Sequence, residues 1–258
     1  MLAVLSPAKT LDFDDAKQSR KRSDPRFVAE ANELATRLQS YSPADLSSLM
    51  GISVKLGELN ADRFGNWDSE SAPQKQAILA FKGDVYMGLE AWTFGARELT
   101  SAQRRLRILS GLYGMLRPLD TIHPYRLEMG TRLEMNGSGN LYEFWGASIT
   151  NAINEDLKDH RSRILVNLAS NEYFDALDSK SIDARIITPV FKDLHSGQYK
   201  FLSYYGKRAR GLMARYLVQQ KVETVKAIKA FAVDGYRYSE TESGDDTPVF
   251  LRNTPAAK

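Results

Sequence analysis

The chain has 258 residues, of which 43% are hydrophobic and 26% charged, and this composition excludes collagenous, fibrous and intrinsically disordered proteins. The absence of cysteine excludes disulfides, thiol nucleophiles, thiolate redox sensing and cysteine-ligated zinc or iron–sulfur clusters. Lysine and arginine total 35 against 32 acidic residues, and the resulting net charge of +3 is too small to identify a partner by itself.

The chain begins with an apolar run, residues 1–5, that predicts a short buried strand. This run is too short for the apolar core of a secretory signal, and no stretch approaches the roughly 18 apolar residues of a membrane span. We therefore expect a soluble protein of the cytosol that does not interact with membranes.

Helices are predicted next. Apolar residues at helical spacing favour a helix from about Arg26. Ser42 is a typical N-cap for a second helix, and Gly51 is suited to the left-handed position that follows the end of that helix. A third helix is predicted over residues 52–64. Together these helices predict an early helical subdomain at about residues 26–66.

Strands and helices alternate in the rest of the chain. Residues 78–81 are strand-like, and a capping-box pattern from Thr100 to Gln103 predicts a helix that runs to Leu109. Further helices are predicted over residues 141–157 and 206–219, and further strands over residues 163–168, 184–191, 199–205, 231–238 and 248–252. We expect an α+β (mixed α/β) fold in one domain, residues 1–258, with a mixed β-sheet surrounded by helices.

The predicted helix 206–219 separates apolar from basic side chains. Lys207, Arg208, Arg210 and Arg215 occupy one arc, and no carboxylate occurs between Lys200 and Arg215. Such a helix is suited to phosphate binding, and it is equally typical of a solvated surface helix, so both interpretations remain open.

Two glycines, Gly111 and Gly114, follow the helix predicted to end at Leu109, with Tyr113 between them. This pattern is typical of a helix-hairpin-helix element, whose turn presents backbone N–H groups to DNA phosphates. The nearby cations would be Arg104, Arg107 and Arg117. The alternative is an ordinary helix-ending glycine with a second glycine in the next turn.

Four residues are candidates for catalysis. Lys9 follows the first strand, where it is placed to bind phosphate or to form a Schiff base. Asp84 lies in a Lys-Gly-Asp sequence that suits a phosphate, a metal or a simple turn. Arg126 and Glu128, two residues apart, favour an internal ion pair. The three histidines are scattered, so we predict no metal site and no cofactor.

Seven longer strings occur along nearly the whole chain. They are SPAKTLD (residues 6–12), AFKGDVY (80–86), LSGLYGMLRPLD (109–120), PYRLEMG (124–130), LYEFWG (141–146), NLASNEYF (167–174) and KRARGLMARY (207–216). In this order they closely resemble the YaaA family of bacterial peroxide stress response proteins. Two departures are Asp175, where a basic residue is expected, and Gly206, where alanine is more usual.

The resemblance implies a cytosolic protein of the response to oxidative stress that keeps free intracellular iron low and so limits damage by hydrogen peroxide. It also implies DNA binding by a basic cleft and a helix-hairpin-helix element, which falls on residues 109–114. We expect a monomer that contacts mainly phosphates with low sequence specificity. The expected DNA-binding residues are Arg104, Arg107, Gly111, Tyr113, Gly114, Arg117, Lys207, Arg208 and Arg210.

The main alternative is an enzyme that acts on a nucleobase, an abasic site or a nucleotide, as a lyase or glycosylase does. Its candidate residues are Lys9, Asp84, Arg126 and Glu128, and their convergence in one cleft would favour it. A third possibility is an iron-handling protein without enzymatic activity. The family resemblance transfers no catalytic mechanism to this chain.

Overall fold

A five-stranded sheet forms the centre of the molecule in a computed structural model that describes residues 1–14, 19–67 and 72–253. The strand order is β6-β5-β1-β8-β9, in which β1, β5, β8 and β9 run parallel and β6 runs antiparallel to β5. The strands are β1 (Leu2–Leu5), β5 (Leu106–Ser110), β6 (Gly114–Leu116), β8 (Ile164–Leu168) and β9 (Arg185–Ile187). Every residue of β1 is buried, as expected for a parallel strand covered on both faces.

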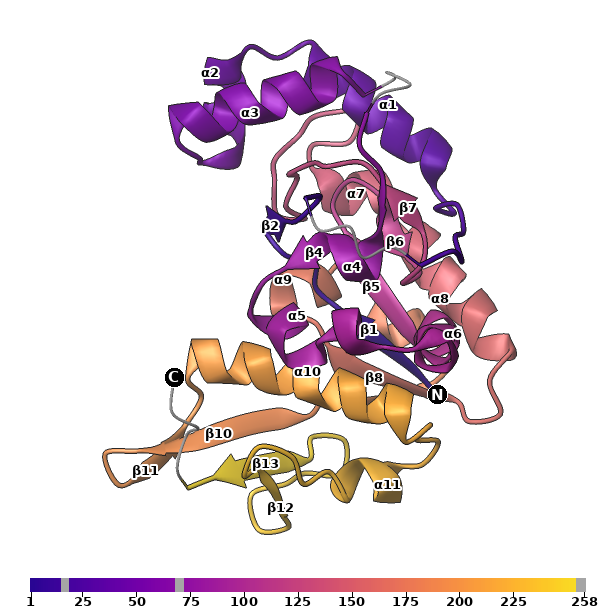
Figure 1. The fold of residues 1–258 in the computed structure, drawn as a ribbon, viewed down its shortest axis with the longest axis vertical. Helices are drawn as coiled ribbons and strands as arrows, with labels where there is room; N and C mark the ends of the chain where they lie inside the picture. The colour runs from indigo at the N-terminus through magenta and orange to yellow at the C-terminus, as the bar shows by residue number, and fades with distance from the viewer. Residues whose placement is uncertain (15–18, 68–71, 254–258) are drawn as a thin grey trace.

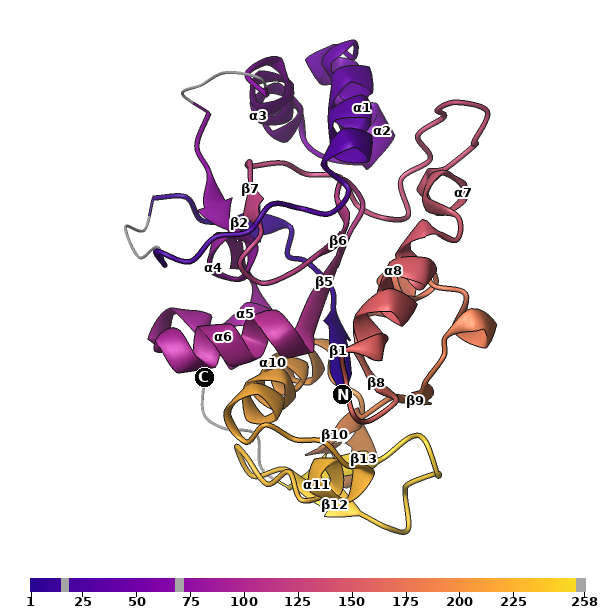
Figure 2. The same cartoon turned by 90° about the vertical axis from the view of Figure 1, so that its right-hand side faces the viewer.

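Helices cover this sheet on both sides. Figure 2 shows α6 (Ala96–Arg105) and α8 (Ser148–Lys158) on opposite sides of β1 and β5. The longest helix, α10 (Ser203–Gln219), lies between the central sheet and a second sheet (Figure 1). Its apolar stripe, which includes Ala209 and Met213, is buried as the sequence predicts.

The second sheet has the order β11-β10-β13-β12. Its strands are β10 (Val190–His195), β11 (Gln198–Lys200), β12 (Arg237–Ser239) and β13 (Val249–Arg252), and α11 (Val225–Lys229) lies nearby. Four short strands pair in twos: β2 (Thr10–Leu11) with β4 (Phe81–Lys82), and β3 (Lys75–Gln76) with β7 (Thr121–Ile122). The predicted α+β fold with a mixed sheet surrounded by helices is therefore confirmed.

Three early helices lie together at the end of the molecule opposite the second sheet (Figure 1). They are α1 (Val28–Gln39), α2 (Pro43–Met50) and α3 (Val54–Gly65). Ser42 caps α2 in a capping box, and Gly51 ends it in the left-handed conformation with φ +59°. The hydroxyl of Ser53 then accepts a hydrogen bond from the backbone N–H of Leu56 and caps α3.

The helix-hairpin-helix element predicted at residues 109–114 is not found there. Helix α6 ends at Arg105, and β5 and β6 form a β-hairpin instead. The predicted capping box was wrong, because Gly95 caps α6 and the Thr100 hydroxyl donates to a carbonyl inside the helix. After Arg105 every residue of β5 is buried against its neighbouring strands, so long-range strand pairing overrides the helical pattern.

Both glycines of this segment serve packing. A Cβ on Gly111 would lie 2.4 Å from the Leu127 carbonyl oxygen, and one on Gly114 would lie 2.7 Å from the Trp145 ring. Gly111 therefore allows the backbone around Leu127 to approach the central sheet.

Other predicted boundaries also differ. Residues 77–80 form a helical turn, α4 (Ala77–Ala80), and the strand there is only β4. The helix predicted at 141–157 is interrupted at Gly146, which separates α7 (Leu141–Trp145) from α8. Residues 84–89 and 171–174 form α5 (Asp84–Leu89) and α9 (Asn171–Phe174). The predicted strand 184–191 is divided between β9 and β10. Residues 199–205 contain the end of β11 and the start of α10, and the only strand residues in 231–238 are the first two of β12.

His160 provides a pH-dependent contribution to stability. Its side chain is buried, and burial together with the Met1 amino group lowers its pKa from 6.5 to about 4. Because the unfolded chain binds a proton at this site more readily, the free energy of unfolding should fall by on the order of 2 kcal/mol as pH drops from 6.5 to 4. Urea titrations at a series of pH values measure this fall.

The matched variants are His160→Gln, which cannot titrate, and His195→Gln at an exposed position. In His160→Gln the free energy of unfolding should change little between pH 6.5 and 4. In His195→Gln its fall over this range should equal that of the unchanged protein. An identical fall in the His160→Gln variant would contradict this assignment.

Candidate functional site

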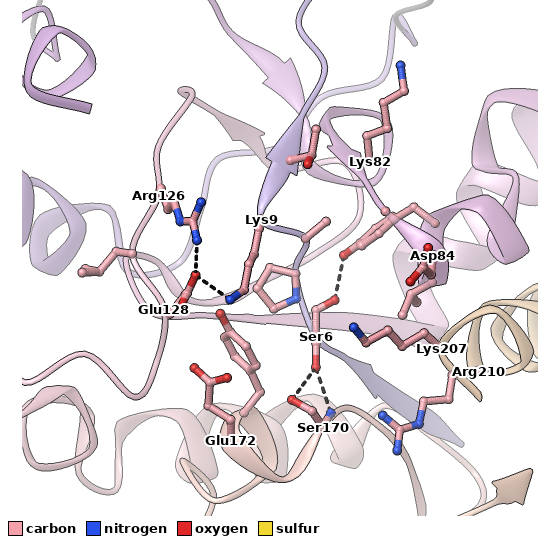
Figure 3. Close-up of a pocket in the computed structure, with 18 of the residues that line it drawn as sticks. Ser6, Lys9, Lys82, Asp84, Arg126, Glu128, Ser170, Glu172, Lys207 and Arg210 are labelled. Atoms are coloured by element: carbon pink, nitrogen blue, oxygen red, sulfur yellow. Dashed lines mark hydrogen bonds and ion pairs between the residues drawn. The ribbon is translucent and has the colours of Figure 1, made fainter. Parts of the chain in front are cut away.

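A cleft of about 470 Å³ opens at the carboxyl ends of β1 and β8, where ligands bind in many parallel sheets. Five of the seven strings that carry the family resemblance contribute to its lining (Figure 3). The lining segments are residues 6–10, 82–86, 125–128 and parts of 170–173 and 207–210. Lys9, Asp84, Arg126 and Glu128, the four candidates for catalysis, all lie in this one cleft.

One wall of the cleft holds a three-residue ion cluster. The Lys9 Nζ lies 3.1 Å from Glu128 Oε1, and the Arg126 Nη2 lies 2.8 Å from the same oxygen. The predicted Arg126–Glu128 pair is thus confirmed, and Lys9 joins it from a distant part of the sequence. The Lys9 side chain is 66% exposed, so its amine is accessible from the cleft, whereas the Arg126 side chain is only 16% exposed.

The opposite wall comes from α5 and α10. Asp84, Lys207 and Arg210 point into the cleft from these helices (Figure 3). Lys207 and Arg210 form no ion pair with any residue of the described ranges. Arg210 is partly buried, and this burial lowers its pKa. A bound anion would stabilise the charge of a half-buried guanidinium that has no carboxylate partner.

Serine and tyrosine side chains fix the base of the cleft. The Ser6 Oγ donates to Ser170 Oγ at 3.2 Å and accepts the Ser170 backbone N–H at 2.8 Å. The Tyr86 hydroxyl donates to the Ser6 carbonyl at 3.0 Å, and complete burial raises the pKa of Tyr86. These bonds tie the loop that carries Lys9 to the end of β8.

Sequence reasoning missed several lining residues, namely Ser6, Tyr86, Ser170 and Glu172. Their position after a predicted strand could have identified two of them, because Ser6 follows β1 directly and Ser170 lies two residues after β8. The carboxyl ends of neighbouring parallel strands meet at one edge of the sheet.

The predicted DNA-binding residues do not come together. Lys207 and Arg210 line the cleft, whereas the other seven lie outside its lining. Arg107 is buried in an ion pair of 2.5 Å with Asp156, and Arg117 pairs with the buried Asp120 at 3.1 Å. Arg104 is exposed and bonds the Asp159 carbonyl. Gly111, Tyr113 and Gly114 are buried in the hairpin, and Arg208 is half-buried on α10.

The two departures from the family pattern have structural counterparts. A Cβ on Gly206 would lie 2.3 Å from the Phe201 ring, so Phe201 occupies the space of the more usual alanine methyl group. Asp175 is exposed and lies outside the lining of the cleft.

A pair of packed helices joined by a tight turn occurs at α2 and α3. The turn is residues 51–53, and a Cβ on Gly57 would lie 2.4 Å from the Pro43 carbonyl oxygen, so the two helices are in close contact. The first N–H groups of α3 have no partner within the helix, and Val54 and Lys55 at this end are exposed. The arrangement presents backbone N–H groups at the surface.

Residues 1–14, 19–67 and 72–253 contain neither a metal-binding group of side chains nor a helix that could cross a membrane. No group of three or more His, Asp or Glu side chains there is placed to hold a metal ion. No helix in the same ranges is long and apolar enough to cross a membrane.

Comparison with known proteins gives one family. A family model described as peroxide stress protein YaaA matches residues 1–242. A UPF0246 protein of Shewanella oneidensis is 50% identical over 254 residues, which is 98% of this chain and 99% of the relative. UPF0246 proteins of Shewanella baltica and Shewanella denitrificans are 50% and 49% identical, each over 98% of this chain and 99% of the relative.

Proposed function

The chain belongs to the YaaA family of peroxide stress proteins, and on this premise we propose that it acts in the cytosol during peroxide stress by binding DNA. The observation that carries the proposal is the pair Lys207 and Arg210, two cations without carboxylate partners in the described ranges that face a cleft. A phosphate supplies the ion-pair partner that these two cations lack.

Binding of this kind reads phosphates rather than bases. Lys207 and Arg210 contact the backbone of the DNA, while Glu128 partly neutralises Lys9 and Arg126 on the other wall. The exposed turn between α2 and α3 is a second contact, because its free N–H groups and Lys55 suit a phosphate. It takes the role first predicted for residues 109–114.

Salt dependence tests the proposal. The logarithm of the DNA affinity is expected to fall with the logarithm of salt concentration with a slope of about −3 or steeper, as for three or more phosphate contacts. Fluorescence anisotropy of labelled oligonucleotides of unrelated sequence, measured from low to physiological salt, gives the slope. Affinity that is independent of salt would overturn the proposal, and strong preference for one sequence would overturn the phosphate mechanism.

The proposal includes lower free intracellular iron, as the family resemblance implies. Because the chain has no cysteine, it acts as an effector whose amount is set by synthesis rather than as a thiol sensor of peroxide. Electron paramagnetic resonance of chelated iron in whole cells tests this part. Cells without the protein should contain more free iron after peroxide treatment, and equal levels would contradict it.

A second candidate function is catalysis on a nucleobase, an abasic site or a nucleotide. The convergence of Lys9, Asp84, Arg126 and Glu128 in one cleft favours it, because carboxylates and cations that line one pocket suit acid–base and nucleophilic chemistry. Incubation of the protein with oligonucleotides that carry an abasic site or a damaged base tests it. Strand scission or base release supports an enzyme, and unchanged substrate opposes one.

A further inference from the structure

We propose that Lys9 is the nucleophile of an imine-forming site that takes the aldehyde of an abasic deoxyribose in DNA. The inference rests on the proposed function, since the cleft must first bind DNA. It assigns to that site a substrate class, a covalent step and a role for each of the three residues on one wall.

Lys9 has the surroundings that amine chemistry needs. Its Nζ is accessible from the cleft, and Glu128 Oε1 at 3.1 Å is placed to take its proton. Glu128 is neutral while it holds this proton and becomes a carboxylate again when it gives the proton up. Arg126 binds the same Glu128 oxygen at 2.8 Å, so Glu128 keeps a cationic partner throughout.

The rest of the cleft suits a sugar with attached phosphates. A cavity of about 470 Å³ has the size of a small-molecule site and holds one nucleotide unit rather than a duplex. Lys207 and Arg210 lie across the cleft from Lys9, where they hold the phosphates that flank the sugar (Figure 3). An abasic unit lacks the pairing and stacking that resist extrusion, so it enters such a cleft at low cost.

The chemistry balances with water as the only co-reactant. The neutral Lys9 Nζ attacks C1′ of the ring-opened aldehyde to give a carbinolamine. Glu128 returns the proton that it took from Lys9 to the carbinolamine hydroxyl, which leaves as water and gives a protonated imine. Glu128 then acts as the base that removes a proton from C2′. The electrons of that C–H bond expel the 3′ phosphate as the C3′–O3′ bond breaks. Water finally hydrolyses the imine and releases Lys9.

Borohydride reduction detects the imine. The full-length protein is incubated with a labelled oligonucleotide that contains one abasic site, and the reaction is quenched with sodium borohydride. We expect a covalent protein–DNA adduct whose modified peptide contains Lys9. Lys9→Arg keeps the positive charge but cannot form the imine, so its adduct should be lost. Lys226→Arg changes an exposed lysine outside the cleft lining and should leave the adduct intact.

Glu128→Gln separates chemistry from binding. This variant should slow strand cleavage at the abasic site by roughly a hundredfold, the usual effect of losing a general base, while the oligonucleotide still binds. Anisotropy with the same oligonucleotide is measured for every variant in parallel. Two results would overturn the Lys9 assignment and leave the proposed function standing. One is DNA binding without an adduct, and the other is an adduct that persists in Lys9→Arg. Absence of DNA binding overturns the proposed function itself.

Discussion

Replacing both Lys207 and Arg210 by alanine is expected to weaken DNA binding by between about tenfold and a hundredfold, and to reduce the magnitude of the salt slope by about 2. The two side chains face the cleft from α10, and neither forms an ion pair within the described part of the chain. Their loss therefore removes the two proposed charge-assisted phosphate contacts and breaks no ion pair within the described residues. Anisotropy titrations at several salt concentrations measure both effects.

The matched control removes two cations elsewhere on the surface. Lys180 and Lys226 are exposed and lie outside the cleft lining, so Lys180→Ala/Lys226→Ala changes the net charge by the same amount. This double variant should lose less than about threefold in affinity, through the general field alone. Equal losses in the two double variants would mean that the cleft is not the DNA-binding site.

Gly211→Ala is expected to lower the free energy of unfolding by about 3 kcal/mol or more. A Cβ at this position would lie only 1.8 Å from the Val85 carbonyl oxygen, and one on Gly88 would lie 2.1 Å from the Arg208 carbonyl oxygen. Helices α5 and α10 therefore cross in direct backbone contact. The clash outweighs the gain of about 1 kcal/mol that alanine brings to a helix. Thermal and urea unfolding measure the net loss.

Gly65→Ala is the control, because Gly65 belongs to α3 and a Cβ there meets nothing within 4 Å. It should leave stability unchanged or raise it slightly. Gly211→Ala should also weaken DNA binding, since α5 and α10 carry Asp84, Lys207 and Arg210 into the cleft. Equal stability of the two variants would contradict the tight crossing described here.

Local chemistry predicted the local features well. Ser42 and Gly51 mark the two ends of α2 because capping depends on residues within one helical turn. The Arg126–Glu128 pair was predictable for the same reason, since the partners are two residues apart. The apolar stripe of α10 follows from helical periodicity, which tertiary packing reinforces.

Long-range contacts explain what sequence reasoning missed. Residues 106–110 form a strand because they pair with β1 and β6, and a helical pattern in the preceding residues contains no information about those partners. The sequence predicts Arg107 as a surface cation, whereas its side chain is buried in an ion pair with Asp156. Lys9 and Glu128 lie far apart in the sequence, so their contact depends on where β1 ends and on the backbone approach that Gly111 allows.

The absence of cysteine makes one direct measurement possible, because a single introduced thiol is the only one in the chain. Lys207→Cys places it in the cleft and Lys226→Cys places it on an exposed surface outside the lining. Each variant is incubated with DNA that carries a thiol-modified tether, and disulfide cross-linking is quantified on non-reducing gels. If the cleft binds DNA, Lys207→Cys cross-links in several-fold higher yield than Lys226→Cys. Equal yields, or cross-linking only at residue 226, would contradict the account.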